Sequence, residues 1–240
     1  MRRFALVLTM LALVIGTAAV AYGAEEGTKV VKMNLMTLIG QSGVIGIFIL
    51  LLSFVGLALI IEHAVTIRRD KLLPQYFVVE LEELFENEEY EEALQFCESE
   101  DNLLSRVVAS GLSKVDLGYT AMEESMSEAA EESSMTLQQK ISYVSLIAAI
   151  APMLGLLGTV MGMMGAFATL AQKAGAASPG DLAGDISMAL MTTIMGLIVA
   201  IPLMGAHHFF RNKVMRLDME AGVIAGDLMQ RFRPNQKVAS

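Results

Sequence analysis

Three long stretches of the chain carry no charged residue, and they run over residues 33–61, 141–172 and 186–206. Each reaches the ~20 residues that an α-helix needs to cross a ~30 Å hydrocarbon core. We therefore predict an all-α membrane protein whose three transmembrane helices lie at residues 43–67, 141–172 and 186–210. The second stretch is longer than one bilayer crossing, so its helix should continue beyond the membrane.

Between the first two spans, apolar residues recur at helical spacing against a background of glutamates. Leu81 and Phe85 share one helix face, and Ala93 and Cys97 share another. This period predicts two antiparallel helices with a turn near "FENEE", followed by a third helix in "NLLSRVVASGL". Residues 68–140 should therefore form a helical domain.

One very long helix is expected to enter the second span. From Met122 to Val144, apolar and small residues recur at steps of three and four without a proline or a glycine. The pattern predicts one continuous helix of about 50 residues, or about 75 Å at 1.5 Å per residue. It should run from the polar domain into the membrane.

The chain begins with the features of a secretory signal peptide. Arg2 and Arg3 precede an apolar run over residues 4–20 and the small-residue patch "AVAYGA". This order predicts a cleaved signal peptide at residues 1–23 and a periplasmic segment at 24–42. The alternative is an uncleaved helix, because the apolar run is long for a signal. In both cases the following residues start outside the cytoplasm.

Basic residues beside the spans predict the orientation, since cytoplasmic flanks carry an excess of lysine and arginine. These residues are "RRDK" at 68–71, Lys140, Arg211, Lys213 and Arg216. The loop at residues 173–185 holds one lysine and two aspartates. We therefore expect residues 68–140 and the tail at 211–240 in the cytoplasm, and the loop in the periplasm. This is the topology of a multi-pass protein of the bacterial inner membrane with a periplasmic N-terminus.

Composition agrees with the membrane class and excludes several functions. The 240 residues are 54% hydrophobic and 18% charged, with a net charge of −9. The segment Glu80 to Asp101 holds eleven acids and no base, which indicates a solvated face or, alternatively, a docking surface for a basic partner. A nucleic-acid footprint is absent. The single cysteine, Cys97, excludes an internal disulfide framework.

Small residues form a stripe on each of the last two spans. In the second span the stripe holds Gly155, Gly158, Gly162 and Gly165, with Thr159 beside it. In the third span it holds Ala189, Thr193, Gly196 and Ala200. Such faces let helices approach closely in lipid. They serve either to pack helices together or to line a narrow channel, and a lone threonine often bonds only its own helix backbone.

Neither of the uncharged stretches at 141–172 and 186–206 holds an acid, a lysine, an arginine or a histidine. Asp185 lies at the outer edge of the third span, as a possible charge at the mouth of a channel. A proton relay needs a titratable group near mid-membrane, so a conducting complex would take its acid from another chain. No hydrolase, P-loop or zinc motif is present, so we expect no enzyme, cofactor or metal site. His207 and His208 are expected at the membrane interface.

Two segments resemble one known family. "APMLGLLGTVMGMMGAF", followed after a polar loop by "DISMALMTTIMGLIVAIPL", is similar to the second and third helices of the MotA/TolQ/ExbB proton-channel family. "LALIIEHAVTIRR" and "EEALQFCES" resemble the end of its first span and its cytoplasmic domain more loosely. Three spans with an exported N-terminus resemble the TolQ/ExbB branch.

The resemblance implies a ring of five subunits around two copies of a single-span partner of the ExbD/TolR type, whose membrane aspartate carries the proton. It implies pore roles for Thr159 and Thr193, which match the family's pore threonines by position. Gly162, Ala189 and Gly196 would line the bore with them, and Gly155, Gly158 and Gly165 would pack the helices. Where the branch has a glutamate in the pattern E-A-L, this chain has Met188.

The predicted function is that of an ExbB-like subunit of a proton-driven motor, which energises envelope work through a TonB/TolA-like effector. The alternative is a non-conducting scaffold that anchors a cytoplasmic or periplasmic partner. A neighbouring reading frame for a short protein with one span and one membrane aspartate would favour the motor, and its absence would favour the scaffold.

Overall fold

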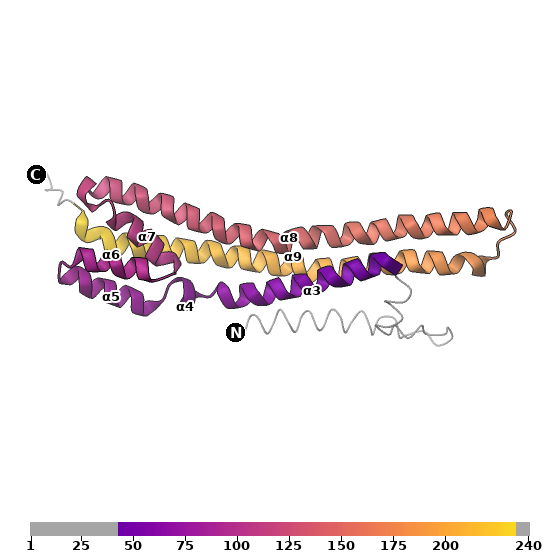
Figure 1. Ribbon diagram of the computed structural model, residues 1–240, viewed down its shortest axis with the longest axis horizontal. Helices are drawn as coiled ribbons and strands as arrows, with labels where there is room; N and C mark the ends of the chain where they lie inside the picture. The colour runs from indigo at the N-terminus through magenta and orange to yellow at the C-terminus, as the bar shows by residue number, and fades with distance from the viewer. Residues whose placement is uncertain (1–42, 234–240) are drawn as a thin grey trace, which may run out of the picture. The chain divides into compact units, whose positions relative to one another are not determined.

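The structure is a computed structural model that describes residues 43–233 (Figure 1). The predicted signal peptide at 1–23 and the segment at 24–42 lie outside the described residues. The described chain consists of helices and contains no strand. The helices are α3 Gly43–Thr66, α4 Arg69–Leu72, α5 Gln75–Glu86, α6 Tyr90–Ser99, α7 Leu103–Leu112, η1 Val115–Leu117, α8 Tyr119–Gln172, α9 Pro179–Met229 and η2 Gln230–Phe232. The prediction of an all-α fold is confirmed.

The described residues divide into two compact units. The first, here called the membrane unit, comprises residues 43–58 and 144–206, and the second, the polar unit, comprises residues 59–143 and 207–233. Three helices, α3, α8 and α9, are long and apolar enough to cross a membrane. The prediction of three spanning helices is therefore confirmed by length and composition.

Helix α8 has 54 residues, close to the length predicted for the continuous helix. It accommodates Pro152 without an interruption of the helix. Helix α9 is longer than the predicted span, because it begins at Pro179 and continues to Met229 with Pro202 inside it. Residues 179–185 of the predicted loop and the start of the predicted tail therefore belong to this helix.

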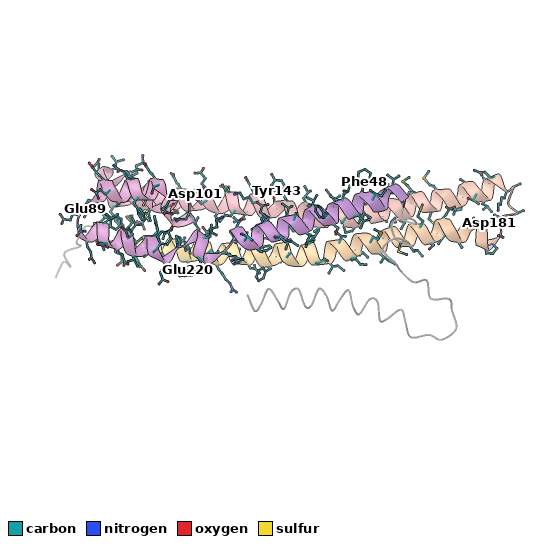
Figure 2. The ribbon with its side chains drawn as sticks, turned by 60° about the horizontal axis from the view of Figure 1, so that its bottom comes forward. Phe48, Glu89, Asp101, Tyr143, Asp181 and Glu220 are labelled. Atoms are coloured by element: carbon teal, nitrogen blue, oxygen red, sulfur yellow. The ribbon has the colours of Figure 1, made fainter. Side chains whose placement is uncertain are left out.

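A local cap explains the early start of α9. The Ser178 backbone N–H donates to Asp181 Oδ2 at 2.8 Å, and the Asp181 N–H donates to Ser178 Oγ at 3.3 Å. This reciprocal pair satisfies free N–H groups at the helix start, and Pro179 supplies a preset φ where no donor is needed. Figure 2 shows Asp181 at the turn between α8 and α9.

The polar unit has its own core, built from the predicted stripes. Phe77, Leu81 and Phe85 of α5 are buried, as are Ala93 and Cys97 of α6. Figure 1 shows α5, α6 and α7 beside the first part of α8 and the last part of α9. Burial of these side chains holds the short helices, which would be marginal in isolation.

An aromatic cluster attaches the end of α9 to the α5–α6 hairpin within the polar unit. The Phe232 ring lies 5.7 Å from Phe85 and 5.1 Å from Tyr90, between centroids. The Arg231 guanidinium lies 5.4 Å from the Phe85 ring centroid. Such contacts contribute about 0.5–1.5 kcal/mol per aromatic pair beyond area burial. The cluster fixes η2, which directly follows α9, on the hairpin.

Two histidines bond consecutive carbonyls of α8 in the polar unit. His63 Nε2 lies 3.1 Å from the Lys140 carbonyl oxygen, and His207 Nδ1 lies 3.3 Å from that of Ile141. A carbonyl only accepts, so each of these ring nitrogens carries its proton. The histidines therefore connect α3 and α9 to α8 where its apolar run begins.

Candidate functional site: the seam between α8 and α9

The glycine stripe of α8 faces α9 across a very close contact inside the membrane unit. A Cβ at Gly155 would lie 3.0 Å from the Thr192 carbonyl oxygen, and a Cβ at Gly162 would lie 2.7 Å from the Ala189 Cβ. At Gly158 a Cβ would collide with the Thr192 side chain. Only glycine permits this approach, which explains the stripe: it packs two helices of the same chain.

Helix α9 contributes a matching glycine. A Cβ at Gly196 would lie 2.6 Å from the Ala151 carbonyl oxygen. Gly162 and Gly196 are buried, and Ala189 is only 3% exposed. The structure therefore places all three of these predicted bore residues in the seam within one chain.

Two adjacent threonines of α9 converge on one carbonyl of α8. Thr193 Oγ1 donates to the Gly155 carbonyl oxygen at 3.2 Å. Thr192 Oγ1 lies 3.3 Å from the same oxygen and 2.8 Å from the Ala189 carbonyl oxygen, to which it donates in better geometry. The Thr193 bond crosses the seam and holds α9 against Gly155, whereas the shorter Thr192 bond stays within α9.

Thr192 was missed by the sequence reasoning, which selected Thr193. Its side chain is 1% exposed, whereas that of Thr193 is half-buried. A signal was present, because Ala189, Thr192 and Gly196 follow one another at steps of three and four. The Thr192 hydroxyl is enclosed between the two helices and serves their packing. The Thr193 side chain is partly exposed and can contact another molecule.

Thr159 lies apart from this pair. Its Oγ1 donates to the Leu156 carbonyl oxygen in its own helix at 2.6 Å. That is the backbone bond typical of a membrane threonine, made here three residues back. The hydroxyl oxygen retains lone pairs for a further donor. The structure thus brings Thr193 onto the seam and leaves Thr159 beside it.

Asp185 lies over the end of the seam that is next to the turn between α8 and α9. Thr169 Oγ1 donates to Asp185 Oδ2 at 3.3 Å, and a Cβ at Gly165 would lie 3.3 Å from the Asp185 carboxyl carbon. Asp185 is half-buried. Gly165 therefore leaves room for a carboxylate that reaches from α9 to α8.

A second carboxylate is held in the turn itself. Lys173 Nζ lies 2.5 Å from Asp181 Oδ1. The bond from Lys173 and those from Ser178 lower the pKa of Asp181. Asp181 is therefore a fixed negative charge of the cap, and the Lys173 charge is neutralised locally.

Beyond Asp185, toward the threonine pair, the seam has no acidic or basic side chain. The α8 sequence has no titratable group from Ser145 to Gln172, and α9 has none from Ile186 to Ala206. In residues 43–233 no group of histidines, cysteines and carboxylates could hold a metal ion. The polar groups that the seam offers are hydroxyls and backbone carbonyls, which can hydrogen-bond a proton carrier but cannot carry the proton themselves.

Large apolar side chains cover the faces of α8 and α9 that the seam leaves free. Those more than half exposed include Met153, Leu156, Met164, Phe167, Leu190 and Ile201. In water such a surface would be an association site, and in a bilayer it meets lipid or other apolar helices. The membrane unit thus combines a closely packed internal seam with an apolar exterior.

These features define a multi-pass α-helical membrane protein with an acid-free polar seam. A sequence profile of the MotA/TolQ/ExbB proton channel family matches residues 99–221, which covers α8 entirely and most of α9. The match spans 123 of the 240 residues, and the chain belongs to this family. Among curated proteins, none matches the chain.

Proposed function

We propose that the protein is the wall subunit of a proton-channel motor of the TolQ/ExbB type. Five copies would surround a single-span ExbD/TolR-like partner in the bacterial inner membrane and drive envelope work through a TonB/TolA-like effector. The observation that carries the proposal is the seam: polar hydroxyls at Thr159 and Thr193 in spans that hold no acid of their own. Neither an enzymatic activity nor a cofactor is part of the proposal.

The missing acid decides the role of the chain. Proton transfer through a membrane needs an ionisable carrier, and such carriers are costly in lipid unless neighbouring groups hydrogen-bond them. In the proposal the partner's aspartate is the carrier and this chain provides the bonding wall. Each proton that crosses 100 mV supplies about 2.3 kcal/mol, so a few protons suffice to rearrange a packed element.

The Thr193 hydroxyl suits both forms of such a carboxyl group. While it donates to the Gly155 oxygen, its lone pairs are free to accept a hydrogen bond from a protonated carboxyl. When the carboxyl group ionises, rotation about the Cβ–Oγ1 bond turns the hydroxyl proton from the Gly155 oxygen toward the carboxylate. Leaving the carboxylate without this bond would cost about 1–3 kcal/mol, which corresponds to one or two pKa units of the partner's acid.

The proposal assigns the small residues to packing. Gly162, Ala189 and Gly196 are buried against the neighbouring helix of the same chain. In the proposed ring these small residues pack α8 against α9 behind the pore surface, and Thr159 and Thr193 line that surface. Asp185 would act as a weak charge at the mouth, screened by salt.

The basic residues beside the spans support the proposed orientation. Because cytoplasmic flanks carry an excess of lysine and arginine, they favour a cytoplasmic location for residues 68–140 and the end of α9 and a periplasmic location for the turn at 173–178. The periplasmic face is then the one from which protons enter, next to Asp185.

Complementation in the native host tests the site. Thr193→Val should abolish or strongly reduce function, Thr159→Val should weaken it, and Asp185→Asn should have a mild effect. Valine has the shape of threonine without its hydroxyl, so each variant keeps the packing and removes the bond. Full activity of Thr193→Val together with loss of activity in Asp185→Asn would transfer the role from the threonine to Asp185.

A further inference from the structure

Basic residues gather in the polar unit just after the apolar parts of α3 and α9. Arg68, Arg69 and Lys71 follow the last residue of α3, and Arg211, Lys213 and Arg216 follow residue 206 of α9. Charged groups at the end of a span lie at the depth of the lipid phosphates. The question is which of these charges are free to bind another molecule.

Two contacts show which face of α9 meets the end of α3 and the start of α4. The His63 ring lies 5.8 Å from the Phe210 ring, between centroids and nearly perpendicular. Arg69 Nη2 lies 2.6 Å from Glu220 Oε1. Lys213 follows Phe210 by three residues and precedes Glu220 by seven, so all three share one helix face. Lys213 therefore lies on the covered face of α9, between the two contacts (Figure 2 labels Glu220).

Arg68 extends toward the same region and lacks an acidic partner. Its Nε donates to the Ala64 carbonyl oxygen at 3.0 Å, which fixes the guanidinium and leaves its two terminal nitrogens available. The ion pairs in the described part of the chain use Arg69, Arg106 and Lys173, and none uses Arg68 or Lys213. The neighbouring Arg69 is already neutralised by Glu220.

Lys213 lies on the face of α9 that Arg69 reaches through Glu220. Arg68 is the residue before Arg69, so its charge is near enough to act on Lys213. Burial lowers the pKa of Lys213, the positive charge of Arg68 lowers it further, and the charge of Asp70 opposes them. Lys213 is thus a half-buried cation beside a second cation. An anion placed between them would relieve this repulsion.

Exposed apolar residues continue the surface of α3 toward the membrane. Val65 is 53% exposed and Ile61 is 57% exposed. Ile61 and Val65 share one face of α3, four residues apart. Arg68 lies past the end of this helix with extended backbone, and its bond to the Ala64 carbonyl brings the guanidinium back beside the last turn that carries Val65. A ligand with an anionic head at Arg68 and a hydrocarbon tail along Ile61 and Val65 would match both parts of this surface.

We propose that Arg68 and Lys213 bind the phosphate of an anionic phospholipid whose acyl chain lies along Ile61 and Val65. The phosphate lies between the guanidinium and the ammonium groups, where Arg68 offers a planar pair of donors and Lys213 a compact charge. The lipid seals the junction of α3, α4 and α9 at the membrane surface. The proposal stands apart from proton conduction, because it uses residues of the polar unit only.

Native mass spectrometry of the full chain in mild detergent tests the site, with phosphatidylglycerol and phosphatidylcholine of the same acyl chains as probes. We expect the wild type to retain phosphatidylglycerol in preference. A basic residue near the surface contributes about 1 kcal/mol to attraction of anionic lipid, which converts to about fivefold in affinity. Arg68→Gln and Lys213→Gln should each weaken retention about fivefold, and the double variant about 25-fold.

Two controls separate the site from general charge and from folding. Lys114→Gln removes an exposed charge elsewhere in the polar unit and should leave retention unchanged. The double variant Arg68→Lys with Lys213→Arg keeps both charges and should retain the lipid, with the same elution and melting temperature as the wild type.

Competition with inorganic phosphate distinguishes a lipid from a free anion. We expect millimolar phosphate to leave bound phosphatidylglycerol in place, because it has no acyl chain to lie on Ile61 and Val65. Displacement by millimolar phosphate would identify a free-anion site and overturn the lipid assignment. Equal retention of the two lipids, or an Arg68→Gln/Lys213→Gln protein that binds like the wild type, would overturn the proposal altogether.

Discussion

The seam makes a sharp prediction at Gly196. Both Gly196 and Gly205 lie in α9 within the membrane unit, but their surroundings differ. A Cβ at Gly196 would meet the Ala151 carbonyl oxygen at 2.6 Å, whereas a Cβ at Gly205 would have no neighbour within 4 Å. Gly196→Ala should therefore destabilise the protein, and Gly205→Ala serves as its matched control.

The magnitude follows from the atoms that Gly196 faces. Since ordinary contacts begin at 3.4 Å and the obstacle is backbone, α8 and α9 have to separate by about 0.8 Å. The bond from Thr193 to the Gly155 oxygen, now 3.2 Å, would then exceed the length of a hydrogen bond. Overpacking costs about 1–3 kcal/mol and the lost bond about 0.6 kcal/mol.

The matched control removes the effect of helix propensity, since each variant gains about 1 kcal/mol from replacing glycine with alanine. The free energies of unfolding of the two variants should therefore differ by roughly 1.5–3.5 kcal/mol. At about 2–4 °C per kcal/mol, Gly196→Ala should melt about 3–14 °C below Gly205→Ala.

Thermal unfolding in detergent, followed by circular dichroism at the helix band, measures this difference. The chain has no tryptophan, so helix content is a more suitable probe than intrinsic tryptophan fluorescence. A Gly196→Ala protein that melts at or above Gly205→Ala would refute the close approach of α8 and α9 and the packing role of the stripe.

Three further predictions concern other parts of the chain. Burial raises the pKa of the Cys97 thiol to about 12, whereas the thiol of the unfolded chain ionises near pH ~8.5. At pH 8 the folded protein should therefore react with maleimide far more slowly than the unfolded chain. Equal labelling rates would contradict the buried position of Cys97. The membrane-purified protein should lack its first ~21–23 residues, and N-terminal sequencing that finds Met1 would show an uncleaved helix. Native mass spectrometry in mild detergent should find a homo-oligomer, expected to be a pentamer, and a mainly monomeric protein would count against the ring.

The long elements of the fold could be predicted because their pattern is uninterrupted. The steps of three and four from Met122 to Val144 run directly into an apolar stretch, and nothing between them favours a break. The early start of α9 was harder to predict, because it depends on the hydrogen bonds between Ser178 and Asp181. The Ser178-x-x-Asp181 spacing with Pro179 after the serine is a helix-start signal in the sequence, and the prediction of a loop at 173–185 overlooked it.

The candidate site was predictable as a stripe but not as a geometry. Glycine and alanine at helical spacing identified the seam, while the rotation of α9 determined which threonine it buries. Thr192 and Thr193 are adjacent, and each stands at helical spacing from Ala189, so the spacing of Thr192 is a signal but not a decisive one. The structure decides between them, because the Thr192 side chain is the one that lies against Gly158.

Proton flux into liposomes is the most direct test of the proposed function. The full chain is reconstituted alone, with its single-span partner, and with a partner whose membrane aspartate is changed to asparagine. We expect flux only with the intact partner, and a strong reduction of that flux by Thr193→Val. Equal flux from the chain alone, or from the complex with the asparagine partner, would contradict the claim that this chain, whose last two spans hold no acid, forms the wall and that the partner carries the proton.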